Sequence, residues 1–346
     1  MEVLNAGDNL LVIQTAFIGD CLLTLPMIAV LAEKNPGIII DVVTTGKSYD
    51  IFSAYENVRK VYLFDKRGKH KSLKSLINFA GELKSENYKR VIAPHRSART
   101  SILVLLSGIK DSYGFDNSAL KFVYRNNFEY KFNAHEVYRN LVFAGDEAAQ
   151  VDPGKIEYNL KISAGERNEI NTVLESLRGK KIIAVAPGTE WATKQYPEEH
   201  FTSVCSGFIS NGFAIAIIGT EKESGLAGRI AAGCGSGAVD LCGRFSIPGT
   251  INFLKQCELL LTNDSSPVHM GYIAKVKTLS LYCSTVPEFG FYPLGERSGW
   301  LSKNDLNCKP CGIHGYKACP LDHFRCGRDL LPGTVINKME QLLSND

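Results

Sequence analysis

The sequence predicts an α/β protein built from two doubly wound domains, and three observations lead to this fold class. Short apolar runs of strand length alternate with segments of helical period along most of the chain. The alternation lapses once, over residues 146–163, and then resumes. With 346 residues, the chain is long enough for two domains of ordinary size. We therefore expect two parallel sheets, each covered by helices on both faces.

The first half begins with the run LLVIQ at residues 10–14, as expected for a strand buried on both faces. A helical pattern follows to residue 35, where Pro36 and Gly37 end it. Pro26 is expected to kink this helix or to lie in its first turn. Further strands are predicted at 38–43, 61–64, 90–93 and 111–114, and further helices from about 48, at 73–85, at 97–107 and at 134–144.

Residues 146–163 contain Pro153 and Gly154 and predict a linker, after which the pattern starts again. We expect an N-terminal domain at residues 1–160 and a second domain of the same type from residue 161. Ligands bind such sheets beyond the carboxyl ends of the strands, so the chemistry is expected in a cleft between the domains. Strands are predicted at 181–186, 213–218, 239–241, 259–261 and 276–282, and helices at 164–177, 198–211, 221–232, 247–256, 267–274 and 332–343.

Composition excludes several classes of protein. The chain is 45% hydrophobic and 22% charged, which is ordinary for a soluble globular protein. It has no uninterrupted apolar run of about 18 residues, and its first residues lack a basic leader, so we expect neither a membrane span nor a signal peptide. The expected location is the cytoplasm. A net charge of +3 is too small to indicate nucleic-acid binding.

The distribution of charge and of cysteine is uneven. Residues 1–165 carry 21 Lys and Arg against 18 Asp and Glu, whereas the remainder carries 18 of each. Nine of the ten cysteines follow residue 200. Four of these could bind structural zinc, but the gaps of seven and six residues after the opening C-x-x-C are atypical, so reduced thiols or a disulfide are favoured. These four are Cys308, Cys311, Cys319 and Cys326.

Familiar nucleotide-binding motifs are missing. The first strand is followed by T-A-F-I-G-D instead of G-x-G-x-x-G, and the chain has no Walker A lysine loop. Both facts disfavour a dehydrogenase and an NTPase. The chemistry must therefore be sought in other turns that follow strands.

Two of these turns carry single charged residues of interest. Asp20 follows the first strand and is either a helix cap or a general base. In the loop at 187–197, Thr189 and Lys194 precede a helix, which suits a pyrophosphate, although a solvated lysine is the simple alternative. The sequence alone leaves these alternatives open.

Two further turns lie later in the chain. Glu221 and Glu223 follow a strand and could either hold ribose hydroxyls or compensate a helix dipole. The turn at 263–266 precedes Pro267, which suits a first helical turn whose free N–H groups face a phosphate. Its simplest interpretation is an ordinary cap, with Asp264 holding its own helix.

Taken together, three motifs resemble glycosyltransferase family 9, the family of ADP-heptose:lipopolysaccharide heptosyltransferases. They are T-x-x-I-G-D-x-x-L-T-L-P at 15–26, P-G-T at 187–189 with K-x-Y-P-E-x-H-F at 194–201, and N-D-S-S-P-x-H at 263–269. The resemblance covers essentially the whole chain in order. It implies a GT-B architecture, in which Rossmann-like domains at 1–160 and 161–328 face each other across a cleft and residues 329–346 pack back on the first domain.

The resemblance also implies a reaction: inverting, metal-independent and cofactor-free transfer of a heptose from ADP-heptose to a lipopolysaccharide inner core. Asp20 would be the general base, and Lys194 would stabilise the departing diphosphate. A preorganised lysine and a helix N-terminus can supply that positive charge without a metal. The implied donor-binding residues are Gly19, Gly188, Thr189, Glu223 for the ribose, Phe245 beside adenine, Asp264 for sugar hydroxyls, Ser265 and Ser266 through backbone N–H groups, and His269.

A basic loop after the third strand would meet the anionic acceptor, and with it the inner face of the inner membrane. The positive charge supports this contact because the acceptor and the membrane surface are both acidic. A solvated loop is the alternative, and Arg96 and Arg99 after the fourth strand could equally begin a capped helix. The expected acceptor-binding residues are Lys66, Arg67, Lys69, Lys71, Arg96 and Arg99, with His70 and Lys74 nearby.

Three other functions remain open at this stage. The same fold could transfer a different sugar from another nucleotide sugar. A sugar-nucleotide epimerase and a non-catalytic sugar-nucleotide binding protein are alternatives of different classes. A binding protein would need the donor-side residues but no base, so Asp20 beside Lys194 and Asp264 disfavours it.

Overall fold

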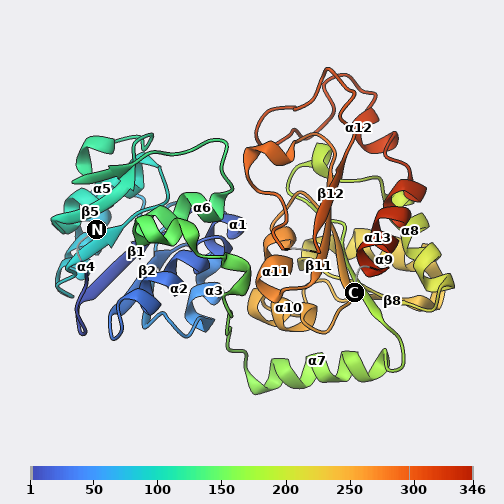
Figure 1. The fold of residues 1–346 in the computed structure, drawn as a ribbon, viewed down its shortest axis with the longest axis horizontal. Helices are drawn as coiled ribbons and strands as arrows, with labels where there is room; N and C mark the ends of the chain where they lie inside the picture. Colours follow the sequence, from blue (N-terminus) through green and yellow to red (C-terminus); the bar gives the residue numbers. More distant parts are fainter. Residues whose placement is uncertain (1–2, 296, 345–346) are drawn as a thin grey trace. The chain divides into compact units, whose positions relative to one another are not determined.

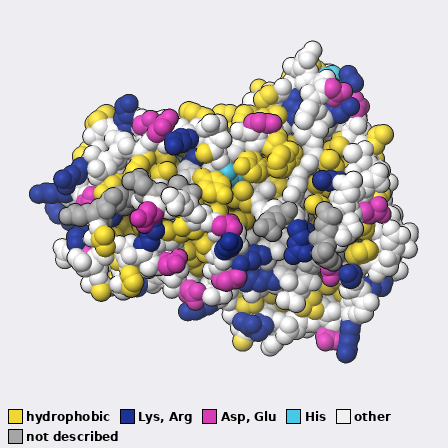
Figure 2. Space-filling model, viewed as in Figure 1, with side chains coloured by type: hydrophobic (Ala, Val, Ile, Leu, Met, Phe, Trp, Pro, Cys, Tyr) yellow, Lys and Arg dark blue, Asp and Glu magenta, His cyan; other side chains and the backbone are white. Residues whose placement is uncertain are grey.

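A computed structural model describes residues 3–295 and 297–344. The chain divides into two compact units, Met1–Lys161 and Ile162–Asp346 (Figure 1). Each unit holds one parallel six-stranded sheet with helices packed on it. In the described part of the chain, no helix is long and apolar enough to cross a bilayer. On the face seen in Figure 2, acidic and basic side chains are interspersed, as the nearly balanced charge leads one to expect.

Unit 1 has the strand order β3-β2-β1-β4-β5-β6. Helices α4 and α5 pack together on one face, over a core that includes Leu11, Phe79 and Leu103, while α2 packs against α6. The strands are β1 Asn9–Ile13, β2 Ile39–Thr44, β3 Lys60–Leu63, β4 Arg90–Ile92, β5 Asp111–Phe115 and β6 Asn126–Phe128, and the helices are α1 Ile18–Leu22, α2 Leu25–Lys34, α3 Tyr49–Ala54, α4 Leu73–Lys84, α5 Ala98–Ser107 and α6 Glu136–Leu141.

Unit 2 has the order β12-β11-β10-β7-β8-β9. Counted from β7, this is the same doubly wound order as in unit 1, in which the chain reverses direction beside the first strand. The strands are β7 Ile182–Ala186, β8 Ala214–Ile217, β9 Ala238–Asp240, β10 Leu259–Asn263, β11 Lys277–Tyr282 and β12 Gly299–Ser302, and the helices are α7 Ala164–Ser176, α8 Glu198–Ser210, α9 Ser224–Cys234, α10 Ile247–Leu254, α11 Pro267–Ala274, α12 Arg325–Arg328 and α13 Pro332–Ser344.

Several elements differ from the sequence prediction. The single helix expected to residue 35 is two helices, and Pro26 lies in the first turn of α2. Strands β6 and β12 were not expected, because Asn126–Phe128 is short and polar and Gly299–Ser302 begins with glycine.

The C-terminal helix has a packing surface within unit 2. The sequence predicts that residues 329–346 pack back on the N-terminal domain, and this stays a prediction. In the structure α13 packs against α8 and β11 of unit 2. Val335, Met339 and Leu342 recur at helical spacing and join the core of that unit, so one apolar stripe accounts for the placement.

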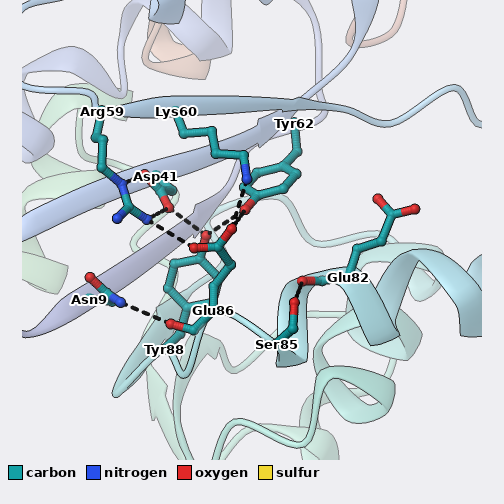
Figure 3. A network of polar contacts seen from close by, with 9 residues as sticks. All are labelled: Asn9, Asp41, Arg59, Lys60, Tyr62, Glu82, Ser85, Glu86 and Tyr88. Atoms are coloured by element: carbon teal, nitrogen blue, oxygen red, sulfur yellow. Dashed lines mark hydrogen bonds and ion pairs between the residues drawn. The ribbon is translucent and has the colours of Figure 1, made fainter.

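A polar network ties together the amino-terminal edge of the unit 1 sheet (Figure 3). The fully buried carboxylate of Asp41 accepts hydrogen bonds from Arg59 and Tyr88. Glu86 accepts from Lys60 Nζ at 2.7 Å and from Tyr62 Oη at 2.9 Å. Since ligands bind doubly wound sheets at the opposite, carboxyl edge, this network is structural.

Candidate active site

The strand order places one switch point in each unit, where neighbouring strands connect in opposite directions: β1/β4 in unit 1 and β7/β10 in unit 2. In unit 1, Thr15 follows β1 and His95 follows β4, and Thr15 Oγ1 lies 2.8 Å from His95 Nδ1. Thr100 Oγ1 lies 2.8 Å from the same nitrogen. Burial, with Lys66 and Arg96 nearby, lowers the pKa of His95 to about 3, so the ring is a neutral link between the two loops.

Asp20 lies in the first turn of α1, beside this switch point. Its Oδ2 accepts a hydrogen bond of 3.2 Å from the backbone N–H of Phe17, so the carboxylate does cap its helix. Burial, followed by the negative charge of Glu136, raises its pKa to about 7 against the opposing effects of backbone N–H groups and Arg96. A carboxyl group with a pKa near neutrality is suited to general-base chemistry. Capping and base chemistry are therefore compatible in one side chain.

The surroundings of Asp20 include a cluster that the sequence analysis missed. Glu136, on α6, accepts hydrogen bonds from Tyr130 Oη at 3.0 Å and from Arg139 Nη1 at 2.9 Å. The guanidinium of Arg96 lies 3.9 Å from the centre of the Tyr130 ring, which is a cation–π contact. These residues are all far from Asp20 in sequence, so only the fold brings their charges near it.

The basic loop is held in a fixed conformation by its own residues. The Asp65 carboxylate accepts hydrogen bonds from the backbone N–H groups of Arg67, Gly68 and Lys69, at 3.1, 2.8 and 3.1 Å. These bonds lower the pKa of Asp65. His70 is buried, and its ring packs against those of Phe64 and Phe79 in a cluster of three rings. The loop therefore has a defined conformation that its own hydrogen bonds and ring contacts maintain.

Two of the predicted acceptor residues, Arg99 and Lys66, donate hydrogen bonds to backbone carbonyls in or beside this loop. The Arg99 guanidinium donates to the backbone carbonyls of Lys66 and His70, at 3.0 and 2.9 Å. Lys66 Nζ donates to the carbonyl of Thr15 at 2.6 Å. Arg67, Lys69 and Lys71 are exposed, so these three residues present the positive charge of the loop to solvent.

At the switch point of unit 2, an ion pair joins the two loops. Lys194, after β7, places Nζ 2.6 Å from Oδ2 of Asp264, which follows β10, and the side chains are only 14% and 12% exposed. Thr285 Oγ1 donates to the same oxygen at 2.6 Å. The N-cap residue of α11 is Ser266. Asp264 is therefore not the cap of its own helix, and that simplest interpretation is wrong.

Asn263, the last residue of β10, bonds the loop that follows β7. Its Nδ2 donates to the carbonyl of Pro187 at 2.7 Å, and its Oδ1 accepts from the backbone N–H of Tyr196 at 2.9 Å. The residue is fully buried. A buried amide that bonds both ends of the 187–197 loop fixes that loop on the sheet.

Glu223 lies directly against the first glycine of that loop. A Cβ at Gly188 would overlap the Glu223 carboxylate, and a Cβ at Gly219 would lie 2.7 Å from Glu223 Oε2. Thr220 donates to Oε2 through its backbone N–H at 2.6 Å and its hydroxyl at 3.0 Å. Gly188 is thus required by close approach, and it brings the ends of β7 and β8 together.

The remaining predicted donor residues lie around these groups or on neighbouring elements. Thr189 Oγ1 donates to the carbonyl of Trp191 at 2.7 Å and shapes its own loop. Burial and the charge of Lys194 lower the pKa of His269 to about 3. Within residues 3–295 and 297–344, no protein group accepts a hydrogen bond from the backbone N–H of Ser265 or Ser266. Gly19 lies in α1, and Phe245 is half-buried with its ring 5.6 Å from Phe253.

The side chains of the four-cysteine segment are not arranged as a set of metal ligands in the described structure. Cys308 Sγ is 4.0 Å from His323 Nε2, and all ten cysteines are unpaired. In the described ranges, no three His, Cys, Asp or Glu side chains are grouped so that they could hold a metal ion. Burial, together with the neighbouring Cys308 and Cys319, raises the pKa of Cys311.

Two Rossmann-like units of identical strand order are the architecture called GT-B, and solved structures agree with this fold. The chain superposes on a glycosyl transferase of family 9 from Veillonella parvula with a TM-score of 0.86, at 20% identity, covering 100% of this chain and 99% of that one. For an ADP-heptose LPS heptosyltransferase II from Escherichia coli, the TM-score is 0.78 at 19% identity, with 97% and 98% covered.

Sequence comparison gives the family. The model of glycosyltransferase family 9 (heptosyltransferase) matches residues 76–319, and the chain therefore belongs to this family. It is 26% identical over 344 residues to a lipooligosaccharide heptosyltransferase 2 of Campylobacter jejuni, covering 95% of this chain and 96% of the relative. It is also 26% identical over 316 residues to a lipopolysaccharide heptosyltransferase 1 of Pseudomonas aeruginosa, covering 88% and 86%. The chain is a glycosyltransferase.

Proposed function

We propose that this glycosyltransferase moves a heptose from ADP-heptose to an acceptor in the lipopolysaccharide inner core, with inversion at the anomeric carbon. The observation that carries the proposal is the Lys194–Asp264 pair at the unit 2 switch point, beside the start of α11. It offers a cation for a diphosphate and a carboxylate for sugar hydroxyls within one hydrogen bond of each other. The names of the relatives supply the sugar: they are heptosyltransferases, and one solved E. coli member is described with ADP.

On the donor side, the diphosphate would bind between Lys194 Nζ and the backbone N–H groups of Ser265 and Ser266. The positive end of α11 and the lysine would stabilise the ADP that leaves, without a metal or another cofactor. Asp264, held by Thr285, would accept hydrogen bonds from the sugar. Gly188 and Thr189 would line the phosphate path, Glu223 would receive the ribose hydroxyls at the end of β8, and Phe245 and His269 would flank the nucleotide.

On the acceptor side, Asp20 would remove the proton from the attacking hydroxyl, with Gly19 allowing the substrate to approach α1. An inverting displacement needs one base on the face opposite the leaving group. The pKa of about 7 lets the carboxyl accept that proton near neutral pH and release it afterwards.

The basic loop would meet the anionic acceptor and the membrane surface that carries it. Arg67, Lys69 and Lys71 point from a loop that Asp65 and Arg99 keep rigid, with Arg96 nearby on the following loop. Leu73 and Ile77 follow on one face of α4 and are 65% and 49% exposed. Basic residues beside exposed apolar ones fit the charge and the polarity of an anionic bilayer surface. We therefore propose a cytoplasmic enzyme that contacts the inner face of the inner membrane peripherally.

A donor panel tests this proposal and its main alternative, transfer of another sugar. Calorimetric titration with ADP, UDP and GDP should show a clear preference for ADP, and transfer to a lipopolysaccharide inner-core acceptor should require ADP-heptose. A preference for UDP or GDP would refute the heptose assignment while leaving the family membership intact.

A further inference from the structure

The loop that carries Lys194 is held from outside by three residues of the cysteine-bearing segment: His314, Gly315 and Tyr316. The backbone N–H of Thr193 donates to the Tyr316 carbonyl at 3.0 Å, and the Tyr316 N–H donates back to Thr193 Oγ1 at 2.7 Å. The indole of Trp191 stacks on the His314 ring, with centroids 6.2 Å apart and planes 13° from parallel. These contacts join segments more than 120 residues apart.

Gly315 is the closest point of this contact. It is buried between exposed neighbours and has a φ of +79°, a conformation that favours glycine. A Cβ there would lie 2.9 Å from Thr193 Oγ1, 2.9 Å from Ser284 Oγ and 3.1 Å from Lys194 Cγ. The backbone of residue 315 therefore touches the stem of the lysine that makes the ion pair with Asp264.

Residues just before these three anchor the segment to the sheet. The backbone N–H of Cys311 donates to the Ser284 carbonyl at 2.8 Å, and Lys309 Nζ donates to the Tyr282 carbonyl at 2.6 Å. Tyr282 ends β11, next to the strand that precedes Asp264. The segment thus spans from the end of β11 to the loop after β7. It therefore links the loop that carries Lys194 to the strand next to Asp264.

We propose that His314, Gly315 and Tyr316 form a clamp that positions Lys194 for the donor diphosphate, with Thr193 as the positioning residue that the clamp grips. This rests on the proposed role of Lys194. The four-cysteine segment then has a function without a metal: it carries the clamp. Thr193 is 3% exposed and bonds Ser284 as well as Tyr316, so its hydroxyl is the hub of the contact.

The chain offers a matched pair of variants. Gly315→Ala adds a methyl group against Lys194, whereas Gly312→Ala adds one in the same segment, also at positive φ (+72°), with nothing closer than 3.7 Å. Both variants strain the backbone, but only the first places its methyl group against Thr193, Ser284 and Lys194. We expect Gly315→Ala to weaken ADP binding about tenfold, the scale of one charge-assisted contact, and Gly312→Ala to leave it within about twofold. Equal losses in the two variants would overturn the clamp.

The hydroxyl of Thr193 provides a second test. Thr193→Val keeps the shape and removes the hydrogen bonds, so ADP affinity should fall several-fold, while Thr193→Ser should restore it. In a double-mutant cycle, adding Thr193→Val to Lys194→Ala should cause no further loss of ADP affinity. Additive losses would mean that Thr193 acts separately from Lys194.

A spectroscopic signal separates failure of the clamp from failure of the proposed function. The chain has two tryptophans, so in a Trp300→Phe background only Trp191 emits. Gly315→Ala should change the Trp191 emission because the indole leaves the His314 ring, and Gly312→Ala should not. Unchanged emission in Gly315→Ala would refute the clamp. A changed emission combined with unchanged ADP affinity in Lys194→Ala would refute the role of Lys194 and leave the clamp standing.

Discussion

The two sheets share one strand order, yet their switch points are built from different chemistry. In unit 1, the loops after β1 and β4 meet through Thr15 and a neutral His95. In unit 2, the loops after β7 and β10 meet through the Lys194–Asp264 ion pair. The unit 1 switch point thus offers a neutral junction beside the Asp20 carboxyl, and the unit 2 switch point offers a fixed charge pair. We conclude that the fold supplies the location and the loop residues supply the chemistry.

The two aspartates make the same contrast. Asp264 has a cation and a hydroxyl on its Oδ2, at 2.6 Å each. Asp20 has a backbone N–H at 3.2 Å, and burial with Glu136 nearby raises its pKa to about 7. A paired carboxylate is a stable hydrogen-bond acceptor, whereas an unpaired one can take up a proton. These surroundings support the proposed roles, Asp264 as the sugar ligand and Asp20 as the base.

The largest expected effect comes from Asp20→Asn. Removing a general base without changing its shape should lower the transfer rate by about 10³-fold and leave ADP affinity within about twofold. Single-turnover transfer and calorimetry with the same preparation measure the two quantities. Normal turnover in this variant would show that the carboxylate of Asp20 does not take the proton.

Lys194→Ala should have the next largest effect, and it tests the switch point of unit 2. Loss of a charged contact should weaken ADP binding by about 10- to 100-fold. Asp264 also loses its cation, so the thermal midpoint should be measured alongside, and Lys194→Arg, which keeps the charge, should keep part of the affinity. Equal affinity for ADP in wild type and Lys194→Ala would remove the lysine from the diphosphate site.

Replacing Arg67, Lys69 and Lys71 together by serine should weaken binding to anionic vesicles by about tenfold or more, since each basic residue near such a surface contributes about 1 kcal/mol. Sedimentation with vesicles of phosphatidylcholine and phosphatidylglycerol measures this binding. The matched control replaces three exposed lysines elsewhere in unit 1: Lys47, Lys84 and Lys121. The same loss in the control variant would mean that the effect is one of net charge and that the loop is not a specific contact.

The smallest expected effect concerns stability and pH. A raised pKa means that folded Asp20 keeps its proton more tightly than the unfolded chain does. Its contribution is therefore most favourable below the unfolded value of 3.8, and it is lost as the pH rises towards about 7. Asp20→Asn removes this loss, so its thermal midpoint should exceed that of the wild type by a few degrees at pH 8. The difference should shrink as the pH falls to 5, and a difference independent of pH would contradict the raised pKa.

Much of the fold follows from the sequence, because buried parallel strands such as Ile182–Ala186 are continuous apolar runs. The order of the turns along the chain was also predictable. Which turns meet was not, since that depends on the order of strands in the sheet: Asn263 bonds Pro187, 76 residues away. For this reason Asp264 looked like a cap, although it is an ion-pair partner.

The same limit explains the contacts that were missed. Arg99 is a basic residue near a basic loop, and sequence reasoning assigned it to a ligand, but its guanidinium binds the loop backbone. Thr193 carries no motif of its own, and its role appears only when Tyr316 lies against it. No signal in the sequence indicates the clamp, because Gly315 approaches the Lys194 loop only in three dimensions.

The central claim is that unit 1 supplies the base and unit 2 holds the donor sugar, and one calorimetric comparison tests it most directly. ADP and ADP-heptose are titrated into the wild type, Asp20→Asn and Asp264→Asn, three proteins of nearly identical shape. The gain in affinity from ADP to ADP-heptose should be unchanged in Asp20→Asn and should largely vanish in Asp264→Asn. A gain that survives in Asp264→Asn, or that is lost in Asp20→Asn, would contradict the division of roles between the two units.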